Sequence, residues 1–277
     1  MIVRQVSPAD LRGIESLLFY GDMVIRHLDW LDVRKWYLDH TTMVMENNGE
    51  LIAVCVIPEE PIGIYWIRLL LKQRNYPTSQ VLHGFWEFWL ANGGGKRHVA
   101  TIQQNLDTVS TLSELGFITR QSIVFLHRQE NAPYPALQPD DEIRIRPMLE
   151  KELEEVAQVD AESFVPLWCN SKDTLTAGLR ANGYGTVAVS GGRVIGYQLS
   201  NQNFGGMHLA RLAVSPQHRG KKIGTLLISG LLRYADMGRC GNISVNTQSD
   251  NDASLALYKR MGFNVGMQTF PVYEFIG

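Results

Sequence analysis

The 277-residue sequence is poor in cysteine, and the few that it has are scattered. Cys55, Cys169 and Cys240 form no Cys-x-x-Cys pair and no Cys/His cluster with the spacing of a zinc site. An odd number of distant cysteines is not typical of a disulfide framework. We therefore expect free or buried thiols in a reducing compartment, and no bound metal.

Long apolar runs and an excess of charge of one sign are also absent. The longest apolar stretch, IGIYWIRLLL, is well short of the roughly 20 residues of a membrane helix. Asp10 and Glu15 interrupt the region where a signal peptide needs an unbroken apolar core. The net charge of −2 gives no general attraction for nucleic acid or an anionic membrane. The sequence thus predicts a cytoplasmic monomer or homodimer with no nucleic-acid or membrane partner.

The chain contains a clear internal break. Apolar residues make up 45% of it and charged residues 19%, which is enough for a sizeable core. The segment RQENAPYPALQPDDE, residues 128–142, has three prolines and an acidic end and no strand or helix periodicity. We expect a first domain at residues 1–128, a linker at 129–142 and a second domain at 143–277.

The two halves repeat one plan, which indicates an internal duplication. Each opens with a short alternating strand, a break and an amphipathic helix, IVRQVSPADLRGIESLL in one and IRIRPMLEKELEEVAQV in the other. Each continues with a hairpin signal and ends with a similar helix, NLDTVSTLSELGF or NDASLALYKRMGF. The aligned pairs are Arg68 with Arg211, Leu69 with Leu212, Asn105 with Asn251, Gly116 with Gly262 and Phe117 with Phe263. The element order predicts an α/β fold with two tandem domains, each a mixed sheet flanked by helices.

One loop in the second half has the composition of an anion site. SPQHRGKKIG, residues 215–224, follows an expected strand and precedes an expected helix. Free N–H groups and the helix dipole favour anions at a helix start, and glycines let a phosphate approach the backbone. Because basic side chains surround two glycines here, the loop predicts a pyrophosphate cradle. The Gly-x-Gly-x-x-Ala match at residues 183–188 precedes a strand and is a chance match.

Two motifs together carry a family resemblance. RGKKIG resembles the Arg/Gln-x-x-Gly-x-Gly/Ala signature of the GNAT superfamily of N-acetyltransferases, with Lys222 in place of the middle glycine. NDASLALYKRMGF resembles the family's Asn-x-x-Ala-x-x-Leu-Tyr-x-x-x-Gly-Phe helix, with Ala256 two places later than usual. The region from Ile143 to Phe275 follows the family's order of elements.

This resemblance implies acetyl-CoA as the cofactor and assigns residues to it. The strand backbone would bind the pantetheine arm, and the loop amides would bind the pyrophosphate. The residues concerned are Leu212, Ala213, Val214, Arg219, Gly220, Lys221, Lys222, Ile223, Gly224 and Thr225. Asn251 would either lie near the pantetheine or cap the following helix. Tyr258 would return a proton to the departing thiolate, and the alternative is a packing aromatic.

A catalytic base is harder to find. The strand HLARLAV offers His208 and Arg211 but no carboxylate, and Asn246 stands where some family members have a glutamate. His208 has a suitable ordinary pKa, although a histidine at a strand start is often structural. At pH 7 an α-amino group is roughly 10% unprotonated and a lysine below about 0.1%. We therefore expect an acceptor with an α-amino group or a small-molecule amine.

The first half looks like a domain that has kept its fold and lost its cofactor. Leu112 replaces the tyrosine, and the loop KQRNYPTSQV has no glycine and includes Pro77, which lacks an N–H. This tandem arrangement is similar to that of mycothiol synthase. The aromatic run FWEFWL, residues 85–90, with Tyr65 and Trp66, predicts either core packing or an acceptor pocket.

Two functional hypotheses remain open from the sequence. The first is an acetyl-CoA-dependent N-acetyltransferase that works by direct attack of a primary amine on the thioester. The second is an acyl-CoA-binding sensor without turnover. The retained Tyr258 favours the enzyme, because a sensor needs no acid beside the sulfur.

Overall fold

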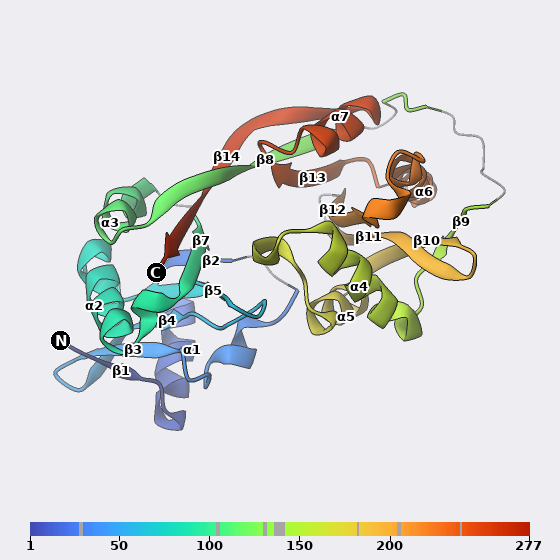
Figure 1. Cartoon of the computed structure of the whole chain (residues 1–277). Helices are drawn as coiled ribbons and strands as arrows, with labels where there is room; N and C mark the ends of the chain where they lie inside the picture. Colours follow the sequence, from blue (N-terminus) through green and yellow to red (C-terminus); the bar gives the residue numbers. More distant parts are fainter. Residues whose placement is uncertain are drawn as a thin grey trace. The chain divides into compact units, whose positions relative to one another are not determined.

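The chain forms two compact units in a computed structural model (Figure 1). One unit comprises residues 1–122 and 270–277, and the other comprises residues 123–269. The structure describes residues 1–27, 30–103, 106–129, 132–135, 142–181, 183–203, 206–238 and 240–277. Among these residues, no helix is both long and apolar enough to cross a bilayer. Most of the expected linker and Asn105 lie outside the described residues.

The first unit is built on a five-stranded antiparallel sheet. Its neighbouring strands follow the order β1-β3-β4-β6-β2. A second group in this unit pairs β5 with β7 in parallel and β7 with the end of β14 antiparallel. The elements are β1 (Ile2–Gln5), α1 (Leu11–Tyr20), β2 (Asp22–Arg26), β3 (Met43–Asn47), β4 (Glu50–Val56), β5 (Ile64–Trp66), β6 (Leu69–Lys72), α2 (Thr78–Ala91), β7 (His98–Ile102), α3 (Val109–Glu114), the start of β8 (Ile118–Arg128) and the end of β14 (Phe263–Ile276).

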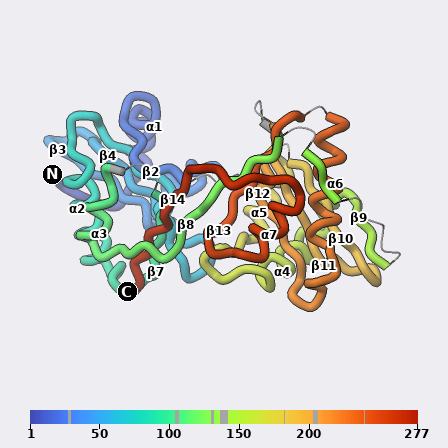
Figure 2. The backbone as a smooth tube through the Cα atoms, turned by 90° about the horizontal axis from the view of Figure 1, so that it is seen from above, coloured from blue at the N-terminus to red at the C-terminus, as the bar shows by residue number. Residues whose placement is uncertain are grey.

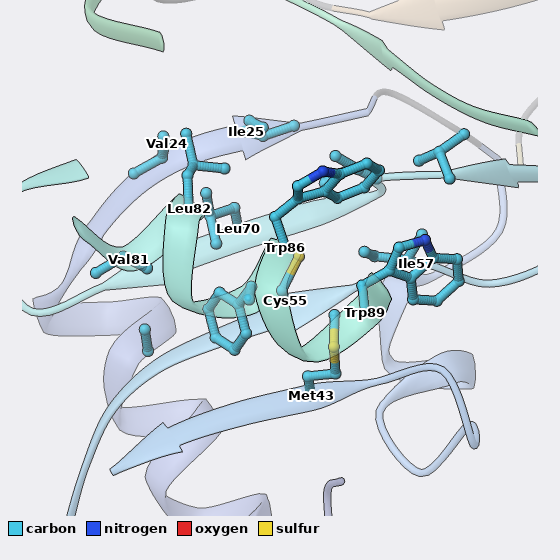
Figure 3. Close-up of a cluster of buried hydrophobic side chains, with 14 of the residues drawn as sticks. Val24, Ile25, Met43, Cys55, Ile57, Leu70, Val81, Leu82, Trp86 and Trp89 are labelled. Atoms are coloured by element: carbon cyan, nitrogen blue, oxygen red, sulfur yellow. The ribbon is translucent and has the colours of Figure 1, made fainter. Parts of the chain in front are cut away.

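Helices cover both faces of the five-stranded sheet. Because side chains alternate along a strand, one strand contributes buried residues to both faces. On β4, Val54 and Val56 pack in a buried cluster with residues of α1. Cys55, between them, packs in a second cluster with residues of α2 (Figure 3). Phe85, Trp86 and Trp89 of the aromatic run are buried in that second cluster. The core interpretation of this run is therefore confirmed.

The second unit is one mixed sheet with helices on both faces. In sheet order its strands are β14-β8-β13-β12-β11-β10-β9. β12 and β13 run parallel, whereas β8-β13, β12-β11, β11-β10 and β10-β9 are antiparallel. The elements are β8 from Ile123 onward, β9 (Arg144–Pro147), α4 (Leu153–Ser163), α5 (Lys172–Arg180), β10 (Gly183–Ser190), β11 (Arg193–Asn203), β12 (Gly206–Val214), α6 (Ile223–Met237), β13 (Ile243–Gln248), α7 (Asp252–Arg260) and β14 up to Thr269.

The two units exchange strands, so their residue ranges differ from the two ranges on either side of the proline-rich segment 128–142. The unit boundary falls between Ser122 and Ile123, within β8, and not at the end of residues 1–128. Residues 123–128 therefore pair with β13 in the second unit. In return, residues 272–276 pair with β7 in the first unit. The path of the green β8 and the red β14 can be followed in Figure 2.

Matching ion pairs support the internal duplication. In the first unit, Arg4 on β1 donates to both carboxylate oxygens of Asp10, at 2.7 and 2.8 Å. In the second, Arg146 on β9 does the same to Glu152. Each carboxylate lies just before a helix and also accepts a backbone N–H three residues earlier. The arginines hold the pKa of both acids below the usual range, that of Asp10 at about 2.

Candidate active site

The site begins where two parallel strands part. β12 pairs with β13 over Met207–Leu209 and Ile243–Val245 only. β12 continues to Val214 and β13 to Gln248 without further pairing between them, and both strands lie wholly within the described residues. The edge of β12 over residues 210–214 that faces β13 is called the open edge below. Such an edge can pair with an extended ligand through backbone hydrogen bonds.

A bulge in β12 decides which side chains lie beside the open edge. Ser200 of β11 pairs with Leu209, but the next residue back, Leu199, pairs with Arg211, so Ala210 is the extra residue. Leu209 belongs to the buried cluster that contains α6. The face of the sheet that α4 covers is called the α4 face, and the opposite one the α6 face. Because the bulge shifts the alternation, the side chain of Arg211 lies on the α4 face, as does that of His208.

The predicted phosphate loop lies between the open edge and α6. Gly220 has a φ of 82°, and a Cβ added there would meet no atom within 4 Å. The backbone is therefore open to a ligand at this residue. Gly224, in the first turn of α6, has the opposite constraint, since its Cβ would come 3.0 Å from Leu257 Cδ2. It lets α6 approach α7 closely.

Lys222 has an unusual backbone conformation that explains the family's glycine. It is the N-cap of α6 with φ 60° and ψ 15°, in the left-handed region. A residue with a Cβ pays about 1–2 kcal/mol there, whereas glycine does not. Lys222 is exposed, as are Arg219 and Lys221. The lysine thus strains the loop but does not close it.

Arg219 ties this loop to the end of α4. Its guanidinium donates to the carbonyl oxygens of Val214 and Ser163, at 3.4 and 3.3 Å. The Ser163 hydroxyl donates to the same Val214 carbonyl at 3.2 Å. The loop's position relative to the open edge is therefore fixed by side chains as well as by the backbone.

The predicted acid and helix cap both lie on α7. Tyr258 is 5% exposed and packs 5.8 Å, centroid to centroid, from the Phe263 ring. Burial raises its pKa, and the nearby positive charge of Arg211 only partly opposes this. Tyr258 therefore holds its proton at neutral pH. Asn251 caps the helix, because its Oδ1 accepts the backbone N–H of Ser254 at 3.1 Å, which confirms the capping role.

His208 belongs to a polar row across the sheet. His127 of β8, Ser244 of β13 and His208 of β12 are direct cross-strand partners in register, so they share a face. His208 Nδ1 lies 2.9 Å from the Ser244 hydroxyl. Burial lowers the pKa of His208, a hydrogen bond to Asn246 raises it, and His127 lowers it. The net direction is down, so His208 is mainly neutral at pH 7.

Sequence reasoning missed a buried polar network on the same face. Asp160 of α4 is fully buried and accepts two bonds from Arg211, at 2.6 and 2.8 Å. It also accepts the hydroxyl of Tyr197 and the backbone N–H of Asn170, the latter at 2.8 Å. The signal was present, since Asp160 follows Val156 and Val159 on the apolar face of its helix. An acid at such a position requires a buried partner.

The corresponding region of the first unit has a different loop. β6 ends at Lys72 and α2 begins at Thr78, so residues 73–77 replace the longer loop of residues 215–222. Pro77 is the N-cap of α2. Leu112, which aligns with Tyr258, is 1% exposed in the apolar cluster.

Comparisons with known proteins agree on one family. Residues 148–263 match the acetyltransferase (GNAT) family. A 120-residue region, 43% of this chain and 76% of the relative, is 31% identical to an uncharacterized N-acetyltransferase of Methanocaldococcus jannaschii. An 86-residue region, 29% of this chain and 52% of the relative, is 35% identical to the N-alpha-acetyltransferase RimI of Mycobacterium tuberculosis. A tandem GNAT protein from the clavulanic acid biosynthesis pathway has the same fold, with TM-score 0.58, 14% identity, and coverage of 84% of this chain and 81% of that one.

Proposed function

The chain belongs to the acetyltransferase (GNAT) family, and on that premise we propose that its second unit acetylates an α-amino group or a small-molecule primary amine. The observation that carries this proposal is the combination of the open edge of β12 with the open backbone at Gly220. The two features are adjacent along the chain and lead directly into the first turn of α6. An extended arm that ends in a pyrophosphate requires these two kinds of binding surface in this order.

The residues fit acetyl-CoA. Leu212, Ala213 and Val214 would offer strand backbone to the pantetheine. The amides from Arg219 to Thr225, at the start of α6, would hold the pyrophosphate, and the exposed lysines 221 and 222 would add positive charge. When bound, acetyl-CoA supplies an activated acyl thioester.

The proton transfers fall to two side chains. Tyr258 holds a proton on its hydroxyl at neutral pH and can donate it to a leaving thiolate. His208 is mainly neutral, and its Nδ1 is held by the Ser244 hydroxyl. We assign its imidazole to accept the proton of the amine. Asn251 contributes by capping the helix that carries Tyr258.

The electrostatics favour an amine that is already partly unprotonated. A carboxylate would help to deprotonate a lysine, but Asp160 on this face is neutralised by Arg211 and accepts two further groups, the Tyr197 hydroxyl and the Asn170 N–H. A neutral histidine carries no negative charge to attract a protonated lysine, so the site suits an α-amino group, which is partly unprotonated at pH 7. The relative RimI is named as an N-alpha-acetyltransferase, which supports the same class.

The activity test measures CoA release at pH 7 with acetyl-CoA and three acceptors. These are a lysine-free hexapeptide with a free N-terminal alanine, an N-acetylated hexapeptide with one lysine, and 2-phenylethylamine. We expect turnover with the first or third, and a fall of about 100-fold in kcat for Tyr258→Phe with unchanged CoA affinity. Faster acetylation of lysine would contradict the acceptor class.

The same assay separates the enzyme from a sensor. Thermal stabilisation by CoA without CoA release on any amine would support an acyl-CoA-binding sensor. The absence of both stabilisation and release would refute the cofactor as well as the activity.

A further inference from the structure

The side chain of Arg211 makes its contacts outside the sheet, with α4 and the residues that follow α4. It forms a two-point ion pair with Asp160, in which the carboxylate is fully buried. Its guanidinium also donates to the carbonyl oxygen of Trp168. The charged carbon lies 3.5 Å from the centroid of the Phe164 ring. A single side chain thus joins β12 to α4 and to the segment that follows α4.

The contacts converge on one connecting stretch, which contains a short 3-10 helix at Pro166–Trp168. Residues 164–170, between α4 and α5, are called the α4–α5 segment here. Arg211 contacts its first residue, Phe164, and the carbonyl of Trp168, while Asp160 accepts the N–H of its last residue, Asn170. The ion pair therefore holds both ends and the middle of the segment. It does so one residue after the bulge in β12, beside the open edge.

The two faces of the second unit's sheet differ in how an acceptor amine could reach His208. On the α6 face, Leu209 and Tyr258 belong to a buried cluster with α6. On the α4 face, His208 is half-buried and Asn246 is exposed. An amine that reaches His208 must therefore approach from the α4 face, which the α4–α5 segment borders.

We propose that the Arg211–Asp160 pair is a positioning device that fixes the α4–α5 segment as a wall of the acceptor site. This inference rests on the proposed function, because it concerns the acceptor of the same reaction. The wall offers the acceptor an apolar surface, since Val165 in the segment is 62% exposed. Arg211 itself touches neither acceptor nor cofactor.

The test replaces the pair as a unit. A lone buried charge would destabilise the protein, whereas apolar substitutes of similar volume for both partners commonly preserve the fold. The test variant is Arg211→Met with Asp160→Leu. The matched control is Arg146→Met with Glu152→Leu, which removes a similar two-point pair three strands away along the sheet. Arg211→Lys provides a second test, because lysine keeps the charge but loses the two-point geometry.

The readouts are the KM of the free-α-amine hexapeptide, the Kd of CoA, and hydrogen exchange of residues 164–170. We expect the Arg211 variants to raise the KM about tenfold and to speed exchange in the segment, with Kd and kcat changed less than about threefold. The control should change neither KM nor exchange there. An unchanged KM in a folded Arg211→Met/Asp160→Leu protein overturns the inference.

The wild-type protein separates the two levels of proposal. If it releases no CoA, the proposed function fails, whereas an unchanged KM in an active variant refutes only the positioning role. Unchanged exchange of residues 164–170 in the double variant refutes that role even without an active acceptor.

Discussion

Replacing Lys222 by glycine should stabilise the protein, although it removes a charged side chain from a predicted anion site. Lys222 has φ 60° and ψ 15°, in the left-handed region where a Cβ costs about 1–2 kcal/mol. Glycine removes this cost but gains about 0.5–1 kcal/mol of chain entropy in the unfolded state. The net gain is about 0.5–1 kcal/mol, or roughly 2 °C in Tm for a chain of this size.

A second variant isolates the backbone effect. Lys222→Ala removes the same positive charge from the N-terminus of α6, which relieves an unfavourable interaction with the helix dipole by a few tenths of a kcal/mol. Because alanine keeps its Cβ, it keeps the strain. The difference between the glycine and alanine variants therefore measures the cost of the Cβ less the extra chain entropy that glycine gains in the unfolded state.

The assay is thermal and urea unfolding of the three proteins, with CoA titrations beside it. We expect the order glycine above alanine above wild type in Tm, and equal loss of CoA affinity in both variants at low salt, since both lose one charge. A glycine variant no more stable than the alanine variant would show that the strain at residue 222 does not exceed the entropy cost of glycine, and the explanation of the family's glycine would be wrong.

Two other expectations follow from the same site. Gly224→Ala should lower stability by about 1 kcal/mol, because its Cβ would press on Leu257 at 3.0 Å. Gly230→Ala on the same helix should raise stability by about 0.5–1 kcal/mol, because its Cβ would make only an ordinary contact with Ile145 at 3.7 Å. Urea unfolding measures both changes. For the free-α-amine hexapeptide, kcat/KM expressed per unprotonated amine should fall only below the ordinary histidine pKa of about 6.5, because burial lowers the pKa of His208 and protonation of this base abolishes its role. His208→Gln should remove that acid limb, and a limb that persists would show that another group titrates.

Much of the site was readable from local sequence, because its features are local. The glycines at residues 220 and 224 and the helix cap Asn251 depend on a few neighbouring residues, and the structure places each at its expected element. The exchanged strands were not readable. β8 crosses the unit boundary because residues 123–128 pair with β13, and pairing partners far apart in sequence leave no local mark. The bulge at Ala210, which turns Arg211 toward α4, is hidden for the same reason.

The first unit has a packed apolar core in the region that corresponds to the candidate site of the second unit. It keeps the short parallel pairing, with Ile64 opposite His98 and Trp66 opposite Ala100, as Met207–Leu209 pairs with β13 in the second unit. Past this pairing it has no open backbone loop. Instead, a cavity of about 10 Å³, room for about one water, is lined only by apolar side chains and Cys55.

Leu112, the counterpart of Tyr258, lines that cavity together with Ile67 and Trp86. An apolar void of this size holds neither a pyrophosphate nor the polar arm that precedes it, and Pro77 at the start of α2 has no N–H to offer an anion. Restoring a tyrosine at position 112 alone would therefore bury an unpartnered hydroxyl and lower stability without restoring binding. Under the proposed function, the same parting of parallel strands would support a ligand in the second unit, whereas it lies beside a packed core in the first, and we attribute the difference to the loop before the helix.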